Sequence, residues 1–113
     1  MPTKTITYHP LGAPVPDASA ERLARDFLLD PNQTNIVVST SNFIDATRCL
    51  VADGVYPHDQ IVFQYERQLN NDNEMIEINI NKYGNLSAWP KGFCDYTEMW
   101  LFRLIKIRSG KPT

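Results

Sequence analysis

The first third of the chain contains apolar residues that recur at helical spacing. After a proline-rich loop at 9–16, Asp17 is a candidate N-cap, because its carboxylate can accept hydrogen bonds from the free N–H groups of a first helical turn. Asp30 precedes Pro31 and ends the segment, since a residue before proline avoids helical dihedral angles. The pattern predicts a helix whose buried face consists of Ala20, Leu23, Ala24, Phe27 and Leu28.

A second helix is predicted after residue 40. Ser41 or Asn42 can serve as its N-cap, and Gly54 suits the position after its last turn, because glycine readily adopts left-handed dihedral angles. Its apolar side consists of Phe43, Ala46, Leu50 and Val51. The charged residues of this helix are candidate active-site groups. Charges on a solvated helix face are far commoner, and we assign that place to Asp45, Arg48 and Asp53.

Short β-branched runs precede both helices. Residues 5–8 form a β-prone run. Residues 35–40 form a second run without alternation, which is typical of a strand buried on both faces of a parallel sheet. Strand, helix, strand, helix is the order of a βαβ unit, so the front half of the chain is predicted to be α/β.

The rear half predicts antiparallel strands. Residues 60–67 form one strand, and residues 74–81 alternate between apolar and polar side chains, which indicates a half-exposed antiparallel strand. A polar hairpin loop at 69–73 joins them, and residues 86–89 are a candidate short third strand. The whole chain, 1–113, is predicted to be a single α/β domain: a βαβ front half, then an antiparallel hairpin or meander, then a C-terminal helix from Tyr96 to about Arg108.

The predicted C-terminal helix is apolar around most of its circumference. Such a helix is normally buried on most sides, and a chain of 113 residues cannot easily enclose it, so part of its surface is a candidate contact with another chain. Alternatively, the segment is a core strand or a helix covered within the domain, because short apolar runs do not distinguish the two. A homodimer through Trp100 or Phe102 is expected, and the candidate partner-binding residues are Trp100, Leu101, Phe102, Arg103 and Ile105.

Composition and charge argue against several classes of protein. A hydrophobic fraction of 42% and a charged fraction of 21% are ordinary for a globular domain. A net charge of -2 lacks the basic excess of a nucleic-acid-binding module, so a nucleic-acid partner is not indicated. No apolar run approaches the ~20 residues of a membrane span and no secretory signal is recognisable. We therefore expect a soluble cytoplasmic protein in which Cys49 and Cys94 are buried free thiols.

No pattern of catalytic or metal-binding residues is recognisable. A P-loop is absent, and no nucleophile elbow or partnered base accompanies the serines. His9 and His58 lie in proline-marked loops without the spacing of metal ligands and are expected to be solvated. We therefore assign no catalytic, cofactor-binding or metal residues, and a small enzyme is the least favoured class of function.

The most distinctive segment is the corner at residues 89–95, which reads Trp-Pro-Lys-Gly-Phe-Cys-Asp. Trp89 precedes a proline and is held extended, and we expect its ring to lie in the core. The glycine allows a sharp turn, Phe93 packs inward and the aspartate caps the final helix. Such a corner orients the helix without any catalytic role, and its structural residues are Trp89, Pro90, Gly92, Phe93 and Asp95.

This corner resembles the C-terminal end of predicted AAA/ABC-type ATPases related to the overcoming-lysogenisation-defect proteins. Members of that family typically end in "W-P-x-G-F-F-D", and Cys94 stands where they have a second phenylalanine. Two upstream segments are similar as well: His9-Pro10 to the family's "H-L-H-P", and residues 35–40 to its strand ending in "E-T-H-S". The resemblance runs in order along most of the chain. The alternative is a coincidental match of the corner on an unrelated α/β domain.

The resemblance implies the distal half of an ATPase head without its chemistry. The family's Walker A, signature and Walker B segments would all precede residue 1, and Ser39, Thr40 and Ser41 occupy the region of its switch histidine. A serine cannot replace an imidazole that contacts a γ-phosphate and its attacking water. The expected function is a non-catalytic interaction subunit that completes or regulates a partner ATPase subunit, as in bacterial or phage-defence systems. The alternative is a free-standing regulator or inhibitor that mimics part of such an ATPase to poison its assembly.

Overall fold

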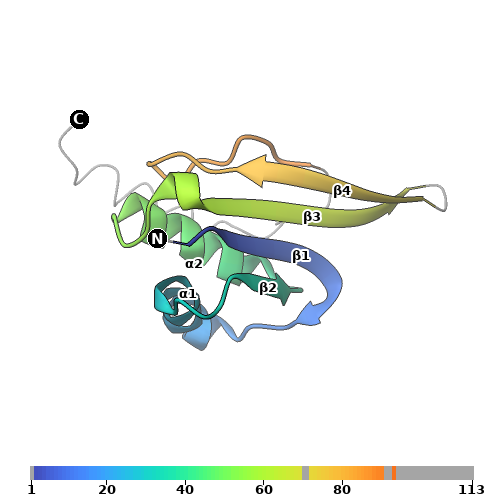
Figure 1. The fold of residues 1–113 in the computed structure, drawn as a ribbon. Helices are drawn as coiled ribbons and strands as arrows, with labels where there is room; N and C mark the ends of the chain where they lie inside the picture. Colours follow the sequence, from blue (N-terminus) through green and yellow to red (C-terminus); the bar gives the residue numbers. More distant parts are fainter. Residues whose placement is uncertain (1, 70–71, 91–92, 94–113) are drawn as a thin grey trace.

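A computed structural model describes residues 2–69, 72–90 and 93 of the chain (Figure 1). In chain order its elements are β1 (Lys4–Ala13), η1 (Asp17–Ser19), α1 (Ala20–Leu29), β2 (Asn35–Val38), α2 (Ser41–Ala52), η2 (His58–Gln60), β3 (Ile61–Leu69) and β4 (Asp72–Asn79). The strands form one sheet in the order β2-β1-β3-β4. β1 pairs in parallel with β2 and β3, and β3 pairs antiparallel with β4.

The predicted α/β class is confirmed by this arrangement, with strand–helix–strand in front and an antiparallel hairpin behind. The third strand predicted at 86–89 is wrong, because only Leu86 pairs, through an isolated bridge to Ile80. Asn81, Lys82 and Tyr83 lead into a turn at Gly84, whose φ of 82° is left-handed. The helix predicted from Tyr96 to Arg108 lies outside the described residues.

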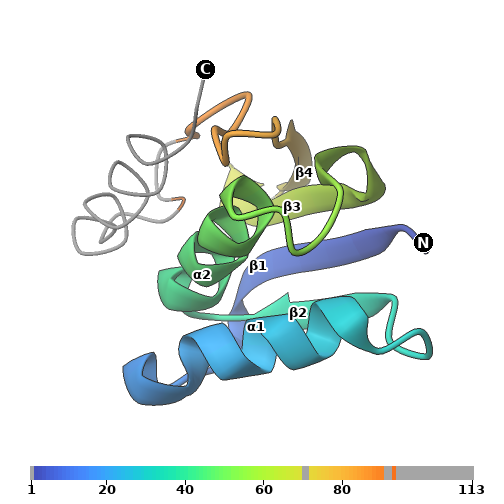
Figure 2. The same ribbon diagram turned by 90° about the vertical axis from the view of Figure 1, so that its left-hand side faces the viewer.

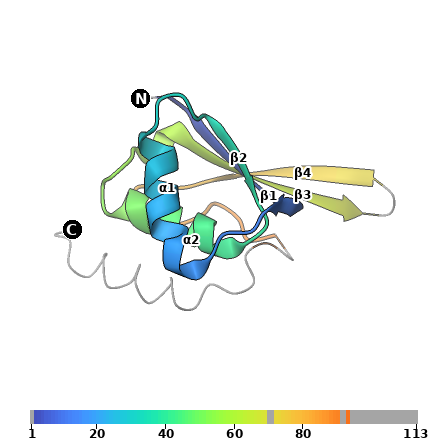
Figure 3. The same cartoon turned by 90° about the horizontal axis from the view of Figure 1, so that it is seen from below.

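Both helices lie on the same side of the sheet (Figures 2 and 3). They touch through Phe27 of α1 and Phe43 of α2, whose ring centroids are 6.0 Å apart. The strands turn alternate side chains toward these helices. Ile6 of β1, Phe63 of β3 and Ile78 of β4 are paired across the sheet and fully buried, so the core lies between this face, here called the covered face, and the helices.

The opposite face of the sheet, here called the open face, is covered by no helix among the described residues. It contains the intervening positions of the same strands, including the cross-strand pair Thr7 and Gln64, whose side chains form a hydrogen bond of 3.4 Å. Thr5 and Val62 form the neighbouring pair, and all four side chains are partly buried. The sheet is mixed, with β2, β1 and β3 parallel and β4 antiparallel at one edge, and helices normally cover both faces of such parallel strands.

The position of β2 differs from the prediction. Its lack of alternation was interpreted as burial on both faces, but β2 is an edge strand. Val38 is fully buried, whereas Val37 is 47% exposed and Asn35 is exposed. The parallel pairing is confirmed, while the burial on both faces is wrong, because a run of β-branched residues does not reveal the order of strands in a sheet.

β1 is longer than the short run predicted at 5–8. It continues through His9-Pro10 to Ala13, with an irregularity in its pairing to β2 after Tyr8. Both Tyr8 and Ala13 are aligned with Val38, so the intervening residues bulge from the ladder. Gly12 is required at this bulge, because a Cβ atom there would lie 2.6 Å from the backbone carbon of Val38.

The buried face of α1 is largely as predicted, whereas α2 is buried at every residue from Asn42 to Ala52 and not on one side alone, and the N-caps are not as predicted. α1 buries Ala20, Ala24, Phe27 and Leu28, while Leu23 is 37% exposed. The residue at the N-cap of α1 is Ser19, and that of α2 is Thr40; neither side chain caps its helix by a hydrogen bond. The predicted cap residues Asp17 and Asn42 instead bond to each other. Gly54 has the predicted left-handed conformation, with a φ of 81°.

Candidate functional site

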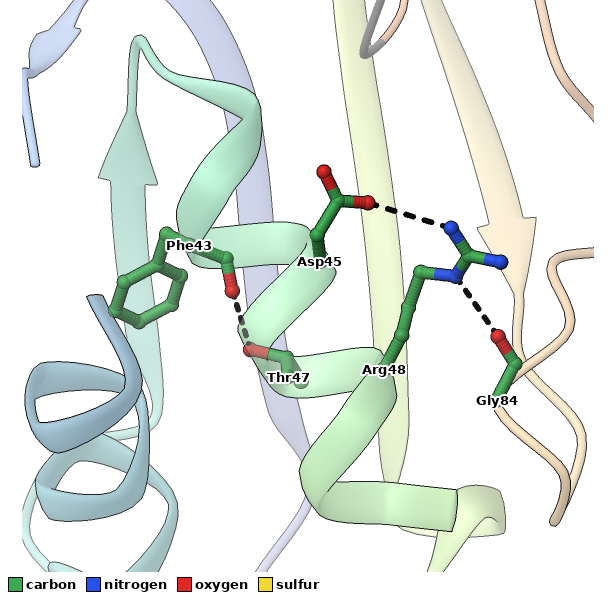
Figure 4. A network of polar contacts seen from close by, with 5 residues as sticks. All are labelled: Phe43, Asp45, Thr47, Arg48 and Gly84. Atoms are coloured by element: carbon green, nitrogen blue, oxygen red, sulfur yellow. Dashed lines mark hydrogen bonds and ion pairs between the residues drawn. The ribbon is translucent and has the colours of Figure 1, made fainter. Parts of the chain in front are cut away.

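Two charged side chains of α2 are buried beneath the turn at residues 81–86. Asp45 is completely buried and Arg48 is 4% exposed, so the solvated face predicted for them is wrong, while Asp53 is exposed as predicted. Arg48 Nη1 donates to Asp45 Oδ1 over 3.3 Å (Figure 4). The sequence feature that could have identified this pair is their spacing, because residues three apart on a helix are neighbours on its surface.

Arg48 also attaches the turn to the helix. Its Nε donates a hydrogen bond of 2.8 Å to the carbonyl oxygen of Gly84. Its guanidinium lies over the ring of Trp89, 4.7 Å from the centroid. One side chain therefore connects α2, the turn after β4 and the start of the Trp89 corner. We call Asp45, Arg48, Gly84 and Trp89 the arginine clasp.

The electrostatics of the clasp are dominated by burial. Removal from water raises the pKa of Asp45 to about 7, and the nearby charge and hydrogen bond of Arg48 oppose this rise. Asp45 Oδ2 is buried and has no hydrogen-bond partner among the described residues. The carboxyl is thus divided between its charged and neutral forms near neutral pH, and only one of its oxygens is held by the arginine.

The corner at residues 89–95 is only partly the core element that was predicted. Phe93 is 2% exposed, as expected, and its ring centroid lies 5.5 Å from those of Tyr8 and Tyr65. Trp89 is 49% exposed, so its predicted place in the core is wrong. Pro90 is partly buried, and its carbonyl oxygen accepts a hydrogen bond from the Phe93 N–H. Gly92 and Asp95 lie outside the described residues.

A second polar cluster lies where β1 and β2 end, in the region that the resemblance assigns to a switch histidine. The Thr40 hydroxyl donates to Asn42 Oδ1 over 2.6 Å and accepts from the Val15 N–H. Asn42 Nδ2 donates to the Val15 carbonyl oxygen and to Asp17 Oδ1. These side chains bond to one another, and their geometry is that of a structural tie between the β1–α1 loop and α2.

The histidines are not the solvated loop residues that were predicted. His9 lies within β1, with Nε2 3.5 Å from Glu66 Oε2 of β3 and Nδ1 accepting from the Leu11 N–H. His58 lies in η2 with Nδ1 3.2 Å from the carbonyl oxygen of Ile80. Both are partly buried. The part of the chain that the structure describes contains no group of three or more histidine, cysteine, aspartate or glutamate residues placed to hold a metal ion.

Several predicted residues are not brought into any described site. The candidate partner-binding residues Trp100, Leu101, Phe102, Arg103 and Ile105 lie outside the described residues, as does Cys94. Cys49 is a buried free thiol, as predicted. Across the described ranges, no helix has both the length and the apolar character needed to cross a membrane.

Sequence reasoning also missed Lys4. Its side chain is fully buried beneath α1, and its ammonium donates to the carbonyl oxygens of Asp30 and Gln33. The ammonium also lies 5.1 Å from the centroid of the Phe27 ring. Lys4 thus ties the start of the sheet to the end of α1, and no sequence pattern marks a lysine for such a place, since lysines are almost always exposed.

A comparison with family models matches part of the chain. The model of a protein family of unknown function, DUF3696, matches residues 56–104. Neither the search of curated proteins nor the search of solved structures gives a match. The matched segment includes η2, β3, β4, the turn at Gly84 and the Trp89 corner. Over this part, which is less than half of the chain, the protein is similar to the DUF3696 family.

Proposed function

We propose that this chain is a non-catalytic interaction lobe that completes or regulates an ATPase head supplied by another chain. In this proposal it acts in the cytoplasm, in a bacterial defence system against phage, as the resemblance of the Trp89 corner implies. The observation that carries the proposal is the open face, which no helix among the described residues covers, although three of the four strands are parallel. Parallel strands are normally covered on both faces, and a second chain is able to supply a second layer.

The chemistry of the open face supports a protein partner. Its central positions, Thr5, Thr7, Val62 and Gln64, are uncharged and partly buried. Uncharged residues of this kind can be covered without the desolvation cost that a charged surface would impose. Glu77 on the edge strand β4 is paired with Gln64, and Glu66 follows Gln64 on β3, so both acids lie on one side of these positions, where a polar rim is ordinary for an interface.

The cluster of Thr40, Asn42 and Asp17 supports the non-catalytic part of the proposal. In the ATPases that the chain resembles, this region carries a histidine that contacts the γ-phosphate. Here Thr40 and Asn42 use their polar atoms to hold Val15 and Asp17. A group fixed in such a network serves packing, and the phosphate chemistry has to come from the partner chain.

The DUF3696 match supports the proposal where the resemblance is most specific. The matched residues, 56–104, include Trp89, Pro90 and Phe93 of the corner. The similarity therefore rests on a longer segment than the corner alone, which disfavours a coincidental match. Within that segment, the arginine clasp fixes the corner to α2, so the matched part and the front half of the chain share contacts.

The proposal is tested by capturing the partner from the native host and measuring ATP hydrolysis. Wild type is compared with Thr7→Arg, which places a long cation on the open face, and with Asp26→Arg, which places the same side chain on the exposed side of α1. We expect wild type and Asp26→Arg to capture a chain with ATP-binding motifs, and Thr7→Arg to capture at least about tenfold less, since an unpaired buried charge costs several kcal/mol.

The turnover of the captured chain then separates the two regulatory roles. Higher ATP turnover in the presence of the lobe supports a subunit that completes the head, and lower turnover supports the inhibitor alternative. Two results would overturn the proposal as a whole: a captured set without any ATP-binding chain, or micromolar ATP binding by the isolated lobe itself.

A further inference from the structure

The two edges of the sheet differ in how they are protected. Along β4, the outer edge carries the acidic Glu74 and Glu77, and its end is covered by Ser87, which exchanges two hydrogen bonds with the backbone of Asn79. β2 has the sequence Asn-Ile-Val-Val and contains neither a charged residue nor a proline. Natural edge strands usually carry charged residues or prolines that oppose pairing with another chain. Without them, the outward backbone groups can pair with a further strand.

One hydrogen bond shows which backbone groups of β2 face β1 and which face outward. Thr5 N–H of β1 donates to the carbonyl oxygen of Thr34, over 2.8 Å, so the backbone groups of Thr34 face β1. Along a strand, successive residues direct these groups to opposite sides. Those of Ile36 therefore face β1, and the N–H and C=O groups of Asn35 and Val37 face outward, at the lower edge of the sheet in Figure 1.

We propose that the outer edge of β2 receives a β-strand from a partner chain, which extends the sheet beyond β2. This inference rests on the proposed function and names the element that the partner contributes. The exposed side chains beside the outward groups are those of Asn35 and Val37, so the incoming strand is uncharged and β-branched at the facing positions.

The small size of the edge favours a partner chain over a second copy. β2 contains four residues, and the outward groups of only two of them are available for pairing. A handful of hydrogen bonds, each worth about 1 kcal/mol net, gives a dissociation constant of about 1 mM, which is too weak to join two copies at micromolar concentration but within reach of a peptide at several millimolar. A partner that also covers the adjoining open face buries far more surface. The added strand then fixes how that partner is aligned with the sheet.

The test uses a synthetic peptide in which threonine and valine alternate between terminal lysines. Binding is followed on the whole chain by NMR and amide hydrogen exchange. We expect shifts at 35–37 and exchange of the Asn35 and Val37 amides slowed by about tenfold or more at saturation. Val37→Pro removes an outward N–H without breaking a bond to β1 and should abolish binding. Glu77→Pro makes the matching change on the outer edge of β4 and should leave binding intact.

The outcomes are distinct. A fold check by NMR accompanies each variant, and Val37→Lys replaces Val37→Pro if the proline variant does not fold, since an edge lysine also opposes pairing. Absence of binding at millimolar peptide, binding at the β4 edge, or a wild-type dimer that Val37→Pro converts to a monomer would each contradict the inference. None of these results bears on whether an ATPase is captured, so failure here leaves the proposed function standing, and failure of capture is seen separately.

Discussion

The covered face and the open face of the sheet come from the same four strands, yet their side chains differ in burial. On β1, Ile6 is fully buried under the helices while its neighbour Thr7 is only partly buried. On β3, Phe63 and Gln64 show the same contrast. The pleat separates the side chains that pack against α1 and α2 from those on a face that no helix among the described residues covers. The stability of the chain should therefore depend on the first face and its partner binding on the second.

The largest effect is expected from truncation on the covered face. Phe63→Ala removes a fully buried ring and should lower the free energy of unfolding by about 3–5 kcal/mol. Gln64→Ala, one residue along on the open face, should change it by less than about 0.5 kcal/mol. Urea unfolding of the two variants measures this difference. Equal losses would mean that the two faces are not distinct in the free chain.

The second-largest loss in the free energy of unfolding is expected at the arginine clasp, which is not part of the covered face. Arg48→Met removes the partner of a fully buried carboxyl and frees the Gly84 carbonyl oxygen, so we expect a loss of about 3 kcal/mol. The exposed Arg25→Met on α1, which removes only a surface pair with Glu21, should cost less than about 0.5 kcal/mol. Similar losses from both variants would show that the clasp is no tighter than a surface ion pair.

The pH dependence of stability sharpens the same point. Because burial raises the pKa of Asp45 to about 7 from an ordinary value of 3.8, the folded state holds a proton that the unfolded state releases. This contribution to stability is full below about pH 4 and is lost as the pH rises to about 7. Relative to Asp45→Asn, wild type should therefore lose stability between pH 5 and pH 7.5. Parallel stability curves for the two proteins would contradict the shift.

The smallest effect is expected at Trp89. Its ring is 49% exposed, so Trp89→Ala should cost about 1–2 kcal/mol, less than the loss for a fully buried aromatic ring. Phe93→Ala, in the same corner but buried between Tyr8 and Tyr65, should cost more. Thermal melts of the two variants show which one loses more stability. A greater loss of stability for Trp89→Ala than for Phe93→Ala would contradict this account of the corner.

Periodicity predicted the buried face of α1 well, because the spacing of its apolar residues determines that face. Ala20, Ala24, Phe27 and Leu28 are spaced for one helix face, and that face is the buried one. The alternation of residues 74–81 likewise placed Ile78 inward. These features depend on local geometry, which the spacing of apolar residues records.

Tertiary features were predicted less well because spacing does not contain them. The β-branched run of β2 gave no sign that it lies at an edge, and the burial of Asp45 and Arg48 depends on a turn contributed by Gly84, far along the chain. Propensity likewise ended the first strand at Tyr8, whereas β1 continues through a bulge to Ala13. These three misses concern contacts between segments that are distant in sequence.

The central claim is that a partner covers the open face, and thiol labelling tests it most directly. Gln64→Cys is prepared in a Cys94→Ser background, in which the remaining thiol, Cys49, is buried. The rate of alkylation at position 64 is measured for the free chain and for its complex with the captured ATPase. We predict that labelling slows by about tenfold or more in the complex, as expected for a thiol removed from solvent. Equal rates in the free chain and the complex would contradict the claim.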